Sequence, residues 1–128
     1  MKKTILVVDD EEAIRKSIGA ILYLNRGFEI LEAEDGLVGL ELAKKQKPDL
    51  IISDVIMDKL NGFMMLESLQ GDPETSKIPV IMMTSQAKDA GAWKSYASIE
   101  YIEKGFSVDD LLVVVDRLLK IQPTDEES

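Results

Sequence analysis

The sequence contains neither cysteine nor histidine. Without cysteine the chain has no disulfide and no thiolate metal site, which fits a reducing compartment. Without histidine it has no imidazole to act as a base, a nucleophile or a metal ligand. Any chemistry must therefore depend on carboxylates, hydroxyls, lysines and a bound metal ion.

Basic residues and long hydrophobic runs are also scarce. The chain has 15 Lys and Arg against 24 Asp and Glu, a formal net charge of −9. Such a surface repels nucleic acid and anionic membranes, so neither is expected as a direct partner. The apolar run at residues 5–8 is too short for a signal peptide or a membrane span. We expect a cytoplasmic protein whose partners are proteins or small cations.

Short β-branched runs alternate with helical spacing along the 128 residues, of which 45% are hydrophobic. Strands are expected at 5–8, 28–33, 50–54, 80–84 and 99–103, and helices at 13–24, 37–43, 63–69, 86–98 and 108–119. This alternation predicts a flavodoxin-like, doubly wound, five-stranded parallel sheet of order 2-1-3-4-5 with five flanking helices. Methionines 57, 64, 65, 82 and 83 are expected to fill the core. We expect one domain at 1–121 and a disordered acidic tail at 122–128.

Polar side chains occur at the carboxyl ends of four predicted strands. They are Asp9, Asp10, Asp54, Thr84 and Lys104. Ligands of open α/β sheets bind at this edge, so the five side chains are expected to gather there. Three neighbouring carboxylates cannot all stay ionised unless a cation lies among them. Oxygen ligands without thiolate or imidazole favour Mg²⁺, with Mn²⁺ as an alternative, over zinc.

Such a cluster suits phosphoryl transfer. A carboxylate beside a divalent ion can attack an activated phosphoryl group and form an acyl phosphate. The oxygens of the transferred group need a metal, an ammonium and a hydroxyl, and Lys104 and Thr84 supply the last two. Taken singly, each residue type at a strand end is usually a cap, a backbone contact or a surface charge. Their convergence on one edge favours a functional site.

Several segments together resemble the receiver family of response regulators, the CheY-like proteins of two-component systems. The matching residues are ILVVDDE at 5–11, DVIM at 54–57, Gly62, Thr84, Ser85 and Lys104. The resemblance covers the chain up to the acidic tail. It implies a signalling switch that a histidine kinase, a phosphotransfer protein or a small acyl phosphate loads with a phosphoryl group. It also implies that the face formed by 86–98, 99–103 and 108–119 binds an unidentified protein target.

The resemblance assigns roles around the metal. It implies that Asp54 is the phosphoacceptor and that Asp10 and Asp54 bind Mg²⁺ directly. Asp9 would bind the ion through water, and the backbone carbonyl of Ile56 would be a further ligand.

The resemblance also assigns the residues that read the phosphoryl group. Thr84 and Lys104 would contact it, and Tyr101 would swing inward when Thr84 moves. A half-buried strand aromatic is the plainer interpretation of Tyr101. Receivers of this kind are not enzymes in the usual sense, since they promote only their own phosphorylation and dephosphorylation.

Two positions depart from the family pattern. Asp58 stands where a proline usually follows the methionine, and we interpret it as a solvated loop residue. Gly105 follows Lys104 where the family usually has a proline with a cis bond, which predicts a trans bond and a more mobile loop. The stretch from Thr84 to Lys104 also looks slightly short, which bears on the predicted fourth helix.

Three other functions fit parts of the pattern. A Mg²⁺-dependent phosphohydrolase of the haloacid-dehalogenase kind would use the same residues, but it needs Asp where this chain has Glu11, and a cap segment. A receiver-like module that no longer needs phosphate would explain the missing prolines but not the intact acids. A flavin carrier would need phosphate-binding donors in the first loop, which is acidic here.

Overall fold

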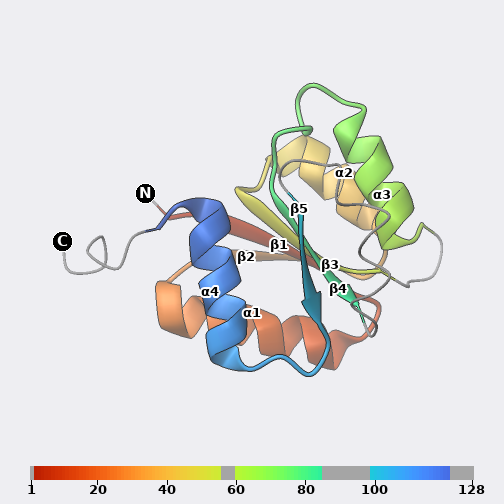
Figure 1. The fold of residues 1–128 in the computed structure, drawn as a ribbon. Coiled ribbons are helices and arrows are strands. Elements are labelled where there is room, and N and C mark those ends of the chain that lie inside the picture. Colours follow the sequence, from red (N-terminus) through yellow and green to blue (C-terminus); the bar gives the residue numbers. More distant parts are fainter. Residues whose placement is uncertain (1, 56–59, 85–98, 122–128) are drawn as a thin grey trace.

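The computed structural model describes residues 2–55, 60–84 and 99–121. These residues form five strands and four helices (Figure 1). In chain order they are β1 (Thr4–Val8), α1 (Glu12–Arg26), β2 (Glu29–Ala33), α2 (Gly36–Gln46), β3 (Leu50–Asp54), α3 (Gly62–Gln70), β4 (Val80–Thr84), β5 (Ile99–Glu103) and α4 (Val108–Leu119).

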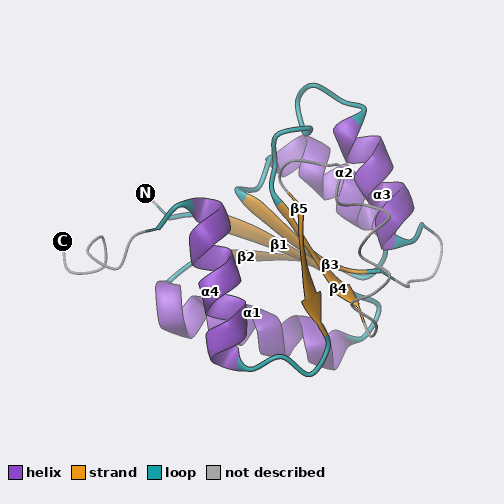
Figure 2. Ribbon diagram, viewed as in Figure 1, coloured by secondary structure: helices purple, strands orange, loops and turns teal. Residues whose placement is uncertain are grey.

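The five strands form one parallel sheet of order β2-β1-β3-β4-β5, which confirms the predicted topology. Helices α1 and α4 cover one face of the sheet and α2 and α3 cover the other (Figure 2). Val8 lies opposite Ala33 of β2 and Ser53 of β3. This register brings the carboxyl ends of the strands to the same edge, where the predicted site residues were expected.

Both faces of the central strands are buried. In β1, Ile5 and Val7 pack in the core under α1 and α4, whereas Leu6 and Val8 pack in the core under α2 and α3. All four side chains have no exposed area. Covering on both faces is why the strands are continuous apolar runs rather than alternating ones.

Local signals set where the helices begin and end. Gly27 follows α1 with a φ of 71°, a left-handed conformation that glycine adopts without strain. Asp35 and Asn61 cap α2 and α3 by accepting hydrogen bonds from backbone amides. Ser107 and Asp110 form a capping box at α4. Because these caps follow strand ends closely, they stabilise the edge that carries the site.

Some expectations fall outside the described residues. They include the helix predicted at 86–98, the position of Met57 and the tail at 122–128. The helix labelled α4 therefore corresponds to the one predicted at 108–119. The expectation for Met64 was wrong, since its side chain is 52% exposed while Met65, Met82 and Met83 are buried. None of the described helices has the length and hydrophobicity that a membrane crossing requires.

Candidate functional site

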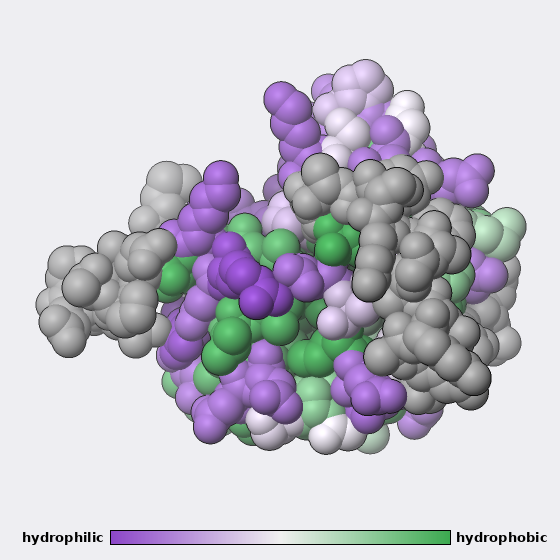
Figure 3. Space-filling model, viewed as in Figure 1, coloured by the Kyte–Doolittle hydropathy of each residue, from purple (hydrophilic) through white to green (hydrophobic). Residues whose placement is uncertain are grey.

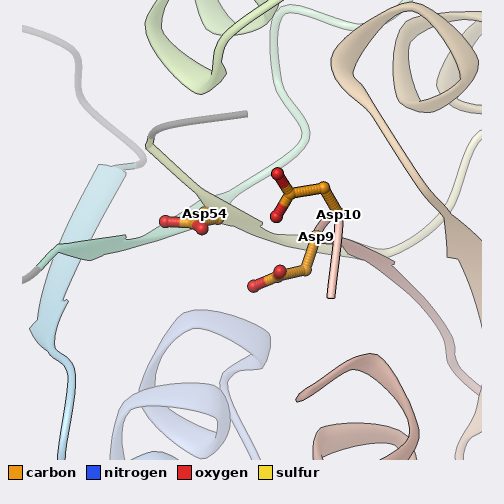
Figure 4. Close-up of side chains that lie close together, drawn as sticks. All are labelled: Asp9, Asp10 and Asp54. Atoms are coloured by element: carbon orange, nitrogen blue, oxygen red, sulfur yellow. The ribbon is translucent and has the colours of Figure 1, made fainter. Parts of the chain in front are cut away.

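Three carboxylates meet at the carboxyl edge of the sheet. Asp9 and Asp10 follow β1, and Asp54 is the last residue of the neighbouring strand β3. One oxygen from each lies within 4.8 Å of those of the other two (Figure 4). Asp9 and Asp54 are buried and Asp10 is exposed. The structure thus brings together the three acids that the sequence predicted to be neighbours.

The position of Asp54 depends on the start of α3. Gly62 lies so close to the end of β3 that a Cβ there would be 2.4 Å from the carbonyl oxygen of Asp54. The amide of Gly62 donates a hydrogen bond of 2.8 Å to the carbonyl of Val55. Only glycine permits this approach, which explains why the position matters to the motif.

Asp9 has one satisfied and one unsatisfied carboxylate oxygen. Its Oδ1 accepts a hydrogen bond of 2.8 Å from the Glu11 amide. Its Oδ2 is buried and has no hydrogen-bond partner among the described residues. Burial, together with the nearby charge of Asp54, raises the pKa of Asp9 to about 6, although the Glu11 amide acts in the opposite direction. A buried acceptor without a donor, beside two other acids, fits a cation ligand.

Lys104 places a positive charge against Asp54. Its Nζ lies 3.0 Å from Oδ2 of Asp54, whose side chain is 7% exposed. Burial lowers the pKa of Lys104, but the hydrogen bond to Asp54 and the charges of Asp54 and Asp9 outweigh it and raise the pKa overall. The lysine therefore stays protonated beside the buried carboxylate.

The end of β4 holds the end of β5. The backbone amide of Lys104 donates a hydrogen bond of 2.7 Å to the carbonyl of Thr84, whose side chain is buried. Gly105 follows with a φ of 96°, and the described residues contain no cis peptide bond. The bond between Lys104 and Gly105 is therefore trans, as predicted, and Gly105 makes the turn in a left-handed conformation.

Tyr101 lies on β5, opposite Met82 of β4. Its side chain is half-buried, and its hydroxyl is buried without a hydrogen-bond partner in the part of the chain that the structure describes. Burial raises its pKa to about 12. Ile56 and Asp58 lie outside the described residues.

Two residues beside the site are not among those predicted from the sequence. Arg15, near the start of α1, donates a hydrogen bond of 2.7 Å to the backbone carbonyl of Asp9. It also donates one of 3.1 Å to Glu32 on β2. The available signal was the position of Arg15 just after the acidic loop, but a charged residue there is more often solvated.

A family model and a relative of similar length identify the family, and a second relative matches over a small part of its own length. The model of the response regulator receiver domain matches residues 5–116. The chain is 35% identical over 117 residues to protein PilH of Pseudomonas aeruginosa, covering 90% of this chain and 96% of PilH. It is 36% identical over 121 residues to histidine kinase P4 of Formosa agariphila, covering 93% of this chain but only 9% of that protein.

The fold agrees with solved receivers. The receiver domain of the sensor histidine kinase PA1611 from Pseudomonas aeruginosa superposes with a TM-score of 0.83 at 21% identity, covering 94% of this chain and 99% of that one. Receiver domains are generally signalling domains rather than dedicated catalysts. With its family-model match and its similarity to PilH along nearly the whole of both chains, this chain belongs to the response regulator receiver family of two-component systems.

Proposed function

We propose that the chain is a Mg²⁺-dependent phosphoacceptor in a two-component phosphorelay and that Asp54 carries the phosphoryl group. The observation that supports this most is the pairing of a buried Asp54 with the Lys104 ammonium, 3.0 Å away, inside a cluster of three carboxylates. A nucleophile, a cation for the transferred oxygens and ligands for a metal thus lie at one strand edge.

The acids fit Mg²⁺, with Mn²⁺ as an alternative. Asp10 and Asp54 would bind the ion directly and Asp9 through water, with the Ile56 carbonyl as a backbone ligand. The Oδ2 of Asp9, which has no hydrogen-bond partner within the described ranges, and the all-oxygen donor set support this assignment. The structure of the PA1611 receiver has a magnesium ion coordinated in its active-site cleft. The ion would offset the negative charge of the acids and of the phosphoryl group.

The transfer uses groups that this chain supplies. A carboxylate oxygen of Asp54 attacks the phosphorus, and the bond from phosphorus to the donor's imidazole nitrogen or acyl oxygen breaks, its electron pair leaving with the donor. Lys104 and the Thr84 hydroxyl donate hydrogen bonds to the phosphoryl oxygens. Later attack by water on the phosphorus returns Asp54 and releases phosphate. These are the only reactions we assign to the chain, which is otherwise not an enzyme.

Loading of Asp54 changes the surface next to β5. The Lys104 ammonium bonded to Asp54 and the Thr84 carbonyl bonded to Lys104 tie the acceptor to the end of β5. A groove of about 440 Å³ runs between β5 and α4, where Tyr101 and Val113 contribute to its wall. Hydrophobic surface is exposed over these two elements (Figure 3), and Val113 is 60% exposed. We assign the binding of a protein target to this face, with Thr84 and Tyr101 as the switch.

The donor would be a histidine kinase or a phosphotransfer protein, and the target a protein not identified by the chain itself. A net charge of −9 opposes direct contact with nucleic acid or an anionic membrane. A role in the cytoplasm follows from this class of donor. We assign these functions to the receiver domain at residues 1–121, and residues 122–128 to an acidic tail.

Intact-protein mass spectrometry tests the proposal. The chain is incubated with acetyl phosphate and Mg²⁺ and compared with Asp54→Asn and with a metal-free sample. We expect one phosphoryl adduct in the wild-type chain and none in the other two samples. Lys104→Ala should still bind Mg²⁺, since it keeps all three acids, but should form less adduct.

The control is the folded state of each variant, followed by circular dichroism. Asp54→Asn keeps the size of the side chain at one strand end, so it should fold. An adduct that persists in folded Asp54→Asn would contradict the assignment of the acceptor. Failure of the wild-type chain to bind Mg²⁺ and to take up phosphate would favour the phosphate-independent module.

A further inference from the structure

Arg15 connects three elements beside the acidic cluster. It lies in α1, and its Nη1 donates to the carbonyl oxygen of Asp9 at the end of β1 while its Nε donates to Oε1 of Glu32 on β2. The side chains of Arg15 and Glu32 are 14% and 28% exposed. Lys16 holds the other oxygen of Glu32 at 2.7 Å. The guanidinium thus spans a backbone acceptor and an anchored carboxylate.

The charge on Glu32 is secured by its neighbours. The hydrogen bond from Lys16, followed by that from Arg15, lowers the pKa of Glu32 despite its partial burial. Because Glu32 stays ionised and bonded on both oxygens, it gives the Arg15 fork a fixed end on β2.

Asp9 is held at three of its four polar atoms. Its amide donates to the carbonyl of Ala33 at 3.1 Å, its carbonyl accepts from Arg15, and its Oδ1 accepts from the Glu11 amide. The remaining atom, Oδ2, is buried beside the other carboxylates without a hydrogen-bond partner in the described ranges. The aim of this oxygen therefore depends on the contacts that fix the backbone of Asp9.

We propose that Arg15 is a positioning residue for the cation site: by holding the Asp9 carbonyl against Glu32, it fixes the direction of the Asp9 carboxylate. The inference rests on the proposed function to the extent that the acids bind a cation. Groups that orient metal ligands commonly set metal affinity although they do not touch the ion.

Charge and position predict opposite effects here. Arg15 is positive and lies near a cation site, so its charge alone opposes Mg²⁺, and removing it would tighten binding. If Arg15 acts by holding Asp9, removing it loosens the Asp9 carboxylate and weakens Mg²⁺ binding. The sign of the change in Mg²⁺ affinity therefore separates the two roles.

The test is Mg²⁺ titration by calorimetry on the full chain and three variants. Arg15→Met keeps the apolar stem and removes the fork, and we expect its dissociation constant to rise about tenfold. Arg15→Lys keeps the charge but has one nitrogen in place of the guanidinium fork, so its Mg²⁺ affinity should lie between those of wild type and Arg15→Met.

Arg26→Met is the matched control. Arg26 makes a similar two-bond contact with Asp116, at 3.0 and 2.7 Å, and its side chain is 18% exposed. It lies at the other end of α1, roughly 16 Å along the helix from Arg15. Arg26→Met should have a lower free energy of unfolding than wild type but the same affinity for Mg²⁺.

A second measurement needs no metal. In Mg²⁺-free protein, the Glu11 amide, which donates to Asp9, should exchange its hydrogen faster in Arg15→Met than in wild type, and at the wild-type rate in Arg26→Met. Unchanged or tighter Mg²⁺ binding by folded Arg15→Met would overturn the positioning role alone. A wild-type chain that binds no Mg²⁺ would overturn the proposed cation site as well.

Discussion

Asp9 is a residue whose burial is energetically unfavourable in the metal-free protein. Its side chain has no exposed area, and its Oδ2 has no hydrogen-bond partner among the described residues. A buried carboxylate beside Asp54 and Asp10 is costly when ionised, and a cation or a proton relieves that cost. The same feature that suits Asp9 to a metal site thus destabilises the metal-free protein near neutral pH.

Asp9→Asn should therefore stabilise the metal-free chain at pH 7. The native pKa of Asp9 is about 6, above its ordinary value of 3.8, so between these values the folded state binds a proton that the unfolded state has released. The contribution of Asp9 to stability is thus largest at low pH and declines as pH rises from about 4 to about 6. At pH 7 the gain in unfolding free energy should be at most roughly 3 kcal/mol. Urea unfolding with a chelator at pH 4 and pH 7 measures it.

Asp10→Asn is the control for this variant. Asp10 belongs to the same cluster but is exposed, so its substitution should change stability little. The difference between wild type and Asp9→Asn should shrink at pH 4, where the Asp9 carboxyl of the folded wild type is protonated and therefore as neutral as the asparagine that replaces it. An Asp9→Asn variant less stable than wild type at pH 7 would show that burial of the charge is not the dominant cost.

Single residues differed in how far the sequence could predict them. Asp9, Asp54, Thr84 and Lys104 were predictable because a strand end fixes where its next side chain lies. Arg15 was not, because its contact with Glu32 depends on how α1 packs beside β2, which local pattern does not encode. The roles assigned to Asp9, Asp10, Asp54, Thr84 and Lys104, and to Ile56 and Tyr101, stay predictions.

Among the elements, α4 depends most visibly on its first turn. Ser107 accepts a hydrogen bond of 3.0 Å from the Asp110 amide, and Asp110 accepts one of 3.2 Å from the Ser107 amide. The helix buries Leu111 and Val115 against the sheet and forms one wall of the groove beside β5. A stable start of α4 therefore supports both the core and the proposed target-binding face.

Ser107→Ala should lower the unfolding free energy by about 1 kcal/mol, because it removes the Oγ that accepts from the Asp110 amide and leaves that amide of the first turn without its partner. Chemical denaturation measures the change. Ser17→Ala is the matched control, since Ser17 is exposed in the interior of α1, where alanine is the better helix former. If both variants lost the same stability, the cap would not be the cause.

Element types were predictable where hydrophobic patterns were long or continuous. All five strands were predicted. The central strands β1, β3 and β4 are covered on both faces and are therefore nearly continuous apolar runs, whereas the edge strands β2 and β5 also carry glutamates. Pattern was weaker in α3, a helix of nine residues in which Met64 and Met65 are adjacent. Adjacent helical positions point about 100° apart, so the two could not both face the sheet, and only packing decided that Met65 did.

At the scale of the molecule, the strand order followed from general rules. Strands that alternate with helices form parallel sheets with right-handed crossovers. The order in which strands join the sheet reverses between β1 and β3, and ligand sites form at the carboxyl ends of the strands beside that point. The consequence is a concentration of negative charge at one edge of a protein that already carries a net charge of −9. Stability of the whole fold should therefore depend on which cations are present.

Mg²⁺ should stabilise the whole chain by binding the folded state. At a concentration about 100 times the dissociation constant, the gain is about 2.7 kcal/mol, which for a domain of this size raises Tm by about 10 °C. Thermal unfolding with Mg²⁺, and again after a chelator removes the ion, measures the shift. A sodium salt of equal ionic strength is the control, since it screens the net charge without occupying the site. Equal shifts of Tm in the two salts would mean that screening of charge, rather than binding at the carboxylate cluster, accounts for the effect. A shift that only Mg²⁺ produces, and that is smaller in Asp9→Asn, would link the stability of the fold to the site at its edge.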